Sequence, residues 1–152
     1  MTGQVDFYVL NGIAPQERRR YVCRLTEKAY LRGLRVAILA DGAEEVRALD
    51  ELLWTFSDHS FVPHKVCSGQ PDTDNTTPVS LMHSLAAGDS VAADVLVNLS
   101  QQLPAEPERF ARIAEILDAD PERRRLGRER FKAYRDLQLT LFSHQIDATA
   151  DA

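Results

Sequence analysis

Short apolar runs alternate with helical segments along this chain, and that alternation limits the possible folds more than any other feature. Val5–Leu10 and Arg35–Ala40 are rich in branched and aromatic residues, as strands are, and each ends at an Asn-Gly or Asp-Gly pair. Pro15–Arg32 and Ala43–Trp54 follow them with apolar residues at helical spacing. Strands joined by helices pair in parallel. We therefore expect an α/β fold: a single three-layer domain with a mostly parallel sheet between helices.

The second half of the chain continues this alternation. The expected elements are strands at Pro78–Met82, Asp94–Leu99 and Ile113–Leu117, a helical turn at Pro104–Phe110 and a final helix at Pro121–Leu137. The segment DVLVNL is apolar almost throughout, which is typical of a parallel strand buried on both faces. Asp118 or Asp120 is the expected N-cap of the final helix. Two stretches fit neither pattern: Phe56–His64, which ends in a Pro-His turn, and the polar loop Ser68–Thr77.

The length of 152 residues suits one domain with a sizeable core. We expect that domain to span residues 1–146, with a flexible tail at 147–152. The formal net charge is −5, yet residues 123–135 carry seven cations and one acid, so the rest of the chain is −11. The overall acidity argues against general affinity for nucleic acid, whereas the basic segment can bind an acidic partner.

Missing motifs disfavour several classes of protein. No GxxxxGK[ST] or GxGxxG loop and no GxSxG elbow is present, so neither a nucleotide-using enzyme nor a hydrolase is expected. Cys23 and Cys67 lack metal-ligand spacing, and we expect two unpaired thiols. No metal or cofactor is expected either, because no helical i, i+4 pair occurs among the histidines His59, His64, His83 and His144. The chain shows no basic leader and no apolar run of roughly 18 residues, so we expect a cytoplasmic protein without a membrane span.

The segment RRLGRERFKAYR (Arg124–Arg135) gathers charge on one side of the final helix. At about 100° per residue, five side chains fall within an arc of roughly 100°. They are Arg124, Arg128, Phe131, Lys132 and Arg135. Leu126, Ala133 and Leu137 fall on the opposite side, which we take as the core-facing side. Phe131 is then an exposed ring among cations, and this indicates a site for an acidic ligand that carries an apolar group.

A second, less specific interpretation of this helix is that its charged side chains contact only solvent. A third is direct binding of nucleic acid by the basic helix 121–137, with a base stacked on Phe131.

A second cluster lies between the helix at Ala43–Trp54 and the turn that follows it. Its members are Trp54, Phe56, Phe61, Val62 and Pro63. Such a cluster either packs into the core against the sheet or forms an exposed patch for a protein partner, because aromatic anchors dominate interface energetics. The sequence leaves both possibilities open.

Two segments resemble the chi subunit of the bacterial DNA polymerase III holoenzyme. They are LDELLWTFSDHSFVPH (Leu49–His64) and GRERFKAYR (Gly127–Arg135), and VDFYVL, PVSLM and DVLVNL occur in the matching order. The resemblance covers residues 5–138 and implies a non-catalytic adaptor in DNA replication. Family members bind the acidic C-terminal tail of single-stranded DNA-binding protein, which ends in a phenylalanine carboxylate, and the psi subunit of the clamp loader.

The resemblance also implies roles for individual residues. Tail recognition falls on Arg124, Arg128, Phe131 and Lys132, with Arg135 on the same helix face. The family often has tyrosine at the position of Phe131 and lysine at that of Arg124. The psi-facing surface falls on Trp54 and Phe61, with the adjacent Val62 and Pro63. Another clamp-loader subunit or a helicase is the expected partner there if psi is absent. The resemblance assigns no role to residues 138–152.

Overall fold

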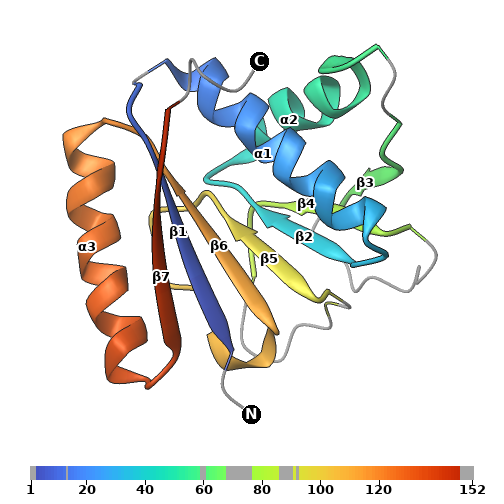
Figure 1. The fold of residues 1–152 in the computed structure, drawn as a ribbon. Helices are drawn as coiled ribbons and strands as arrows, with labels where there is room; N and C mark the ends of the chain where they lie inside the picture. The colour runs from blue at the N-terminus through green and yellow to red at the C-terminus, as the bar shows by residue number, and fades with distance from the viewer. Residues whose placement is uncertain are drawn as a thin grey trace.

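A single parallel sheet with helices on both faces forms the framework of the computed structural model (Figure 1). The structure describes residues 3–12, 14–58, 61–67, 77–85, 91 and 93–147. Within them the sheet has seven strands, in the order β3-β4-β2-β5-β6-β1-β7, and every neighbouring pair is parallel. The strands are β1 (Gln4–Leu10), β2 (Val36–Leu39), β3 (His64–Val66), β4 (Val79–Met82), β5 (Val95–Asn98), β6 (Arg112–Leu117) and β7 (Thr140–Ile146).

The helices follow the expected pattern closely. They are α1 (Pro15–Leu31), α2 (Ala43–Thr55) and α3 (Pro121–Asp136), with a short 3-10 turn η1 at Pro107–Arg109. The α/β fold class is confirmed, and the sheet is entirely parallel among the described strands.

Two strands differ from expectation. The strand expected to be last, at Ile113–Leu117, corresponds to β6, but β7 follows α3 and pairs with β1 along its whole length. His64 begins the three-residue strand β3 instead of ending a turn. Both missed strands are sheet edges, where a strand needs little or no continuous apolar run. The loop expected at residues 68–77 lies outside the described residues except at Thr77, and the expected tail does so except at Asp147.

Side chains alternate between the two faces of the sheet and form two separate cores. On β2, Val36 and Ile38 join a cluster with α1 and α2, whereas Ala37 and Leu39 join a second cluster with α3. This alternation follows from the two-residue period of a strand. α1 and α2 therefore cover one face, and α3 lies on the other (Figure 1).

The order of the strands places α2 and β3 at one edge of the sheet and α3 and β7 at the other. From β1 the chain runs through α1, β2 and α2 to β3 at one edge. Later it passes through β6, adjacent to β1, and α3 carries it to β7 at the other edge. Surfaces on α2 and β3 consequently lie at the opposite end of the sheet from surfaces on α3 and β7.

A matched pair of leucines tests the placement of the core. Leu53 on α2 is 0% exposed, whereas Leu31 at the end of α1 is 73% exposed. We expect Leu53→Ala to lower the free energy of unfolding by about 2–5 kcal/mol, because it removes packing atoms and leaves a cavity. Leu31→Ala should change it by less than about 0.5 kcal/mol. Urea denaturation of both variants measures the difference, and equal losses would contradict this packing of α2.

Candidate functional site

The start of α3 is fixed by two aspartates with different tasks. Asp120 is the N-cap, and its carboxylate accepts a hydrogen bond from the backbone N–H of Arg123 at 2.9 Å. Asp118 accepts two bonds from the Arg123 guanidinium, at 2.9 and 2.7 Å. Burial opposes ionisation of Asp118, but the bonds from Arg123 and the Asp120 N–H outweigh it and lower the pKa of that carboxyl. The first turn of α3 is therefore tied to the end of β6.

The side of α3 that faces the sheet is not the side that the apolar residues suggest. Gly127, Arg130 and Tyr134 are buried, while Leu137 is exposed. The expected core-facing set of Leu126, Ala133 and Leu137 is therefore wrong: the first two are only half-buried. Gly127 permits a close approach to the sheet, because a Cβ there would lie 2.6 Å from Cδ1 of Leu117.

A buried carboxylate on β6 explains why a charged residue faces the core. Glu115 is 0% exposed, and the guanidinium Nη2 of Arg130 lies 3.1 Å from its Oε1. The hydroxyl of Tyr134 donates to Glu115 Oε2 at 2.6 Å, and the amide of Asn98 donates to the same oxygen at 2.8 Å. Burial and the negative charge of Glu115 raise the pKa of Tyr134, so its hydroxyl stays protonated and acts as the donor.

Phe131 belongs partly to the core. Its ring centroid is 5.3 Å from that of Phe7 on β1, and the residue packs against the core on the α3 face of the sheet. The expectation of a ring standing clear of the apolar side is corrected accordingly. Because the ring is half-buried, its inner part is held by Phe7 and its outer part borders the solvent beside the cations of α3.

Several of the cations of α3 are already engaged within the protein. Arg125 pairs with Glu122 at 2.8 Å and with Glu129 at 3.4 Å, and the bond to Glu122 raises its pKa. Arg124 donates to two backbone oxygens, that of Asp118 at 2.8 Å and that of Leu10 at 3.1 Å. Arg124 thus bridges the backbone at the carboxyl ends of β1 and β6. These bonds occupy part of its guanidinium, which is therefore less available to a ligand.

Three cations of α3 have no ion pair or side-chain hydrogen bond with any residue that the structure describes. They are Arg128, Lys132 and Arg135, all exposed. Their i, i+4 and i+7 spacing aligns them along one side of the helix, with Phe131 beside them. We call Arg128, Phe131, Lys132 and Arg135 the α3 surface. Unpaired guanidinium groups beside a fixed ring suit a peptide that offers carboxylates and an aromatic side chain.

The aromatic cluster after α2 divides between surface and core. Trp54 is 49% exposed and Phe61 is 65% exposed, and their ring centroids lie 5.5 Å apart. Pro63 is half-buried, whereas Val62 is 0% exposed and belongs to the core. Val62 is therefore removed from the expected partner-binding set. Phe56 also packs against the core.

His64 supports this exposed pair from beneath. Its ring centroid lies 4.3 Å from that of Trp54, and it is buried. Its Nδ1 is 2.6 Å from the backbone oxygen of Val62, and its Nε2 is 3.1 Å from a carboxylate oxygen of Asp50. These contacts connect α2 to the start of β3 and hold Trp54 and Phe61, which we call the aromatic pair, in place at the surface.

The remaining residues considered for chemistry are inert or scattered. Cys23 and Cys67 form no disulfide bond with each other, and burial raises the pKa of the Cys23 thiol to about 12. Among the described residues, no three His, Cys, Asp or Glu side chains are grouped as metal ligands. His59 lies outside the described residues. In the described part of the chain, no helix combines the length and apolar character needed to cross a membrane.

Comparisons with known proteins agree with one another. A family model described as DNA polymerase III chi subunit, HolC, matches residues 1–141. DNA polymerase III subunit chi of Pseudomonas aeruginosa is 32% identical over 143 residues, which cover 94% of this chain and 96% of the relative. The chi subunit of Escherichia coli is 28% identical, over 85% of this chain and 88% of the relative.

Among solved structures, one that resembles this chain is similar in fold but not in sequence. It is that of T4 UvsW, with a TM-score of 0.68 and 11% sequence identity. The match covers 96% of this chain but spans only 42% of the UvsW chain.

The Glu115–Arg130 pair makes a prediction of its own. Arg130→Met leaves the Glu115 carboxylate buried without its cation, so we expect a loss of about 3–5 kcal/mol in the free energy of unfolding. The double variant Glu115→Gln, Arg130→Met removes the uncompensated charge and should be more stable than Arg130→Met alone. Urea denaturation at neutral pH compares the two. A double variant that is no more stable than Arg130→Met would show that the unpaired Glu115 carboxylate is not what destabilises Arg130→Met.

Proposed function

Because this chain belongs to the family of DNA polymerase III chi subunits, we propose that it links the acidic C-terminal tail of single-stranded DNA-binding protein to the clamp loader through psi. It is a non-catalytic accessory subunit and part of the DNA polymerase III holoenzyme. The observation that carries the proposal is the α3 surface. There, three cations without partners among the described residues lie beside a ring fixed by Phe7.

The tail matches this surface in charge and in its terminal aromatic ring. Its terminal carboxylate suits the guanidinium fork of Arg128, and its other acidic residues suit Lys132 and Arg135. Its last aromatic ring packs against the outer part of Phe131. Arg124 contributes positive charge nearby and holds the strand ends with its Nε and Nη2. Salt screens the charged contacts but leaves burial of the ring intact, so the complex weakens at high salt without being abolished.

The aromatic pair is the proposed site for psi, or for another clamp-loader subunit or a helicase that replaces it. Two large apolar side chains, Trp54 and Phe61, are exposed together and are supported by the buried His64. Aromatic anchors on a rigid base carry a large share of interface energy. The pair lies near the β3 edge, whereas α3 leads to the β7 edge, so both partners can bind at once.

The first prediction for this function concerns Arg128. We expect Arg128→Ala to weaken tail binding by about 1.5–3 kcal/mol, the usual worth of a charged hydrogen bond. Arg125→Ala is the matched control, because Arg125 lies on the same helix but is neutralised by Glu122 and Glu129. Fluorescence anisotropy with a labelled tail peptide measures both affinities. A peptide without its terminal phenylalanine should bind the native chain poorly even at low salt.

Two outcomes would contradict this use of the α3 surface. Equal affinities of Arg128→Ala and the native chain for the peptide would exclude Arg128 as the carboxylate ligand. Tight binding of bare single-stranded DNA that Arg128→Ala abolishes, with no binding of the peptide, would favour direct nucleic-acid binding by α3 instead.

The second prediction for this function concerns Phe61. We expect Phe61→Ala to weaken capture of psi by about 2–4 kcal/mol while tail binding stays unchanged. Because Phe61 is exposed, the melting temperature should remain near that of the native chain. Phe142→Ala is the control, since Phe142 is 46% exposed on the distant strand β7. A lowered melting temperature with joint loss of both interactions would contradict the role of Phe61 as a surface anchor.

A further inference from the structure

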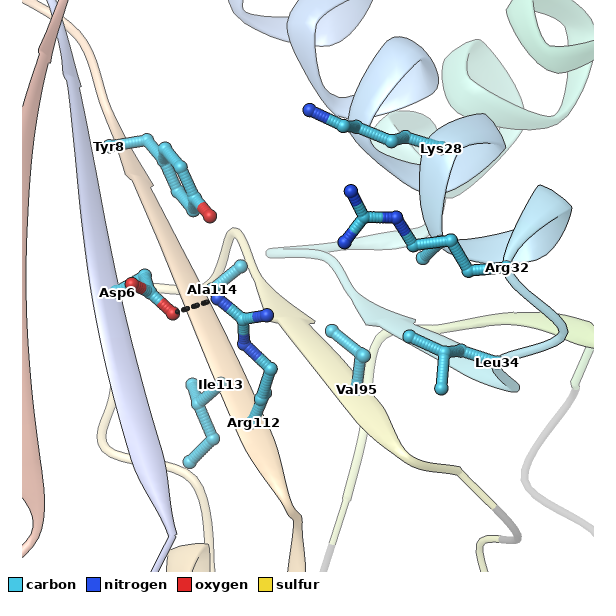
Figure 2. Close-up of a pocket in the computed structure, with 10 residues that line it drawn as sticks. Asp6, Tyr8, Lys28, Arg32, Leu34, Val95, Arg112, Ile113 and Ala114 are labelled. Carbon is cyan, nitrogen blue, oxygen red and sulfur yellow. Dashed lines mark hydrogen bonds and ion pairs between the residues drawn. The ribbon is translucent and has the colours of Figure 1, made fainter.

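A small hollow lies on the face of the sheet covered by α1, outside both proposed interaction surfaces. It has a volume of about 150 Å³ and opens between the C-terminal end of α1 and strands β1, β5 and β6 (Figure 2). Ala29, Leu34, Val95 and Ala114 supply its apolar lining. α3 lies on the other face of the sheet, so a ligand in this hollow leaves the α3 surface free.

Hydrogen-bond donors from three elements point into this hollow. The side chains of Lys28 and Arg32, from the end of α1, extend toward Tyr8 on β1 and Arg112 on β6 (Figure 2). Lys28, Arg32 and the Tyr8 hydroxyl form no ion pair or side-chain hydrogen bond with any described residue. Burial and the nearby Asp6 carboxylate raise the pKa of Tyr8, so its hydroxyl remains a donor.

Asp6, the acidic residue that lines the hollow, already has hydrogen-bond and ion-pair partners. Asp6 accepts from Arg112 at 2.9 Å and from Gln4 at 3.1 Å, and its other oxygen lies 2.9 Å from Nε2 of His144. Although burial opposes ionisation, the bonds from His144 and Arg112 lower the pKa of Asp6. The Asp6–Arg112 pair is therefore neutral as a unit. The positive charges of Lys28 and Arg32 remain uncompensated by the residues that line the hollow.

We propose that this hollow binds a phosphate monoester group, held by Lys28, Arg32 and the Tyr8 hydroxyl. A phosphate monoester carries a charge of about −1.5 to −2 at neutral pH and three acceptor oxygens, which match two free cations and a neutral donor. A carboxylate, with one negative charge, would leave one of these cations unmatched. The apolar lining suits the carbon skeleton that bears the phosphate.

The size of the hollow limits the rest of the ligand. A hollow of about 150 Å³ has room for several water-sized groups, which is enough for a tetrahedral oxyanion and a small attached group. Pockets that enclose whole drug-sized ligands measure about 300–1,000 Å³. The site therefore recognises the phosphate group itself. That group belongs either to a free small phosphate or to the 5′ end of a DNA strand.

The test begins with inorganic phosphate and the full-length chain. Backbone amide NMR spectra are recorded during titration with phosphate and, at matched ionic strength, with chloride. We expect saturable shifts near Tyr8, Lys28 and Arg112 with phosphate only. Lys28→Gln and Arg32→Gln should each weaken phosphate binding by about 10-fold or more, the usual worth of a charged hydrogen bond.

Arg20→Gln is the matched control, because Arg20 is exposed on α1 about two turns before Lys28 and does not line the hollow. It should leave the phosphate affinity unchanged. Tyr8→Phe should weaken binding by about 2- to 10-fold, since it removes one neutral hydrogen bond. The substituted cations are exposed, so their variants keep the native spectrum away from the hollow.

A second arm identifies the source of the phosphate. A single-stranded oligonucleotide with a 5′-phosphate is compared with the same strand ending in a 5′-hydroxyl. Tighter binding of the phosphorylated strand, with competition by inorganic phosphate, would support a strand end as ligand. Binding of inorganic phosphate with no preference between the strands would support a small free phosphate. Absence of saturable shifts with inorganic phosphate, or equal losses in Arg20→Gln and Lys28→Gln, would overturn the proposal.

Discussion

One buried carboxylate decides how α3 sits on the sheet. Glu115 is enclosed in β6, and a buried charge without a partner costs several kcal/mol. α3 satisfies it by turning Arg130 and Tyr134 inward, at 3.1 and 2.6 Å from the carboxylate oxygens. With that side of the helix committed to the sheet, Arg128 and Lys132 face solvent. The position of the α3 surface is thus a consequence of an ion pair beneath it.

The cations of α3 fall into two groups, which the net charge of the helix does not distinguish. Arg123, Arg124 and Arg130 bind carboxylates and carbonyls of the sheet, and they fasten the helix. The cations that remain without partners among the described residues are the ones available to an acidic ligand. Because a charge already paired inside the protein offers little to a partner, the number of free cations matters more for binding than the total.

The parallel sheet separates three surfaces that use different chemistry. The α3 surface combines cations with a half-buried ring, and the aromatic pair near the β3 edge is apolar. The hollow beside α1 lies on the face opposite α3 and presents donors with two uncompensated positive charges. Helices cover both faces of the sheet, and no residue belongs to more than one of the three surfaces. This arrangement is compatible with the proposed binding of two proteins at separate surfaces.

Local spacing in the sequence predicts the strands with continuous apolar runs and the three helices. It offers Asp118 and Asp120 as caps of the last helix, and the structure uses Asp120. The sequence also identified the α3 cations and the aromatic pair as candidate binding residues. The burial of Val62 and the packing of Phe131 on Phe7 follow from long-range contacts that local spacing does not contain. The edge strand β7 was missed because the sheet defines it through pairing with β1. The inner side of α3 was misplaced because an arginine is ordinarily a surface residue. A carboxylate 15 positions earlier in the chain reverses that preference, and this partner becomes known only when the chain is folded.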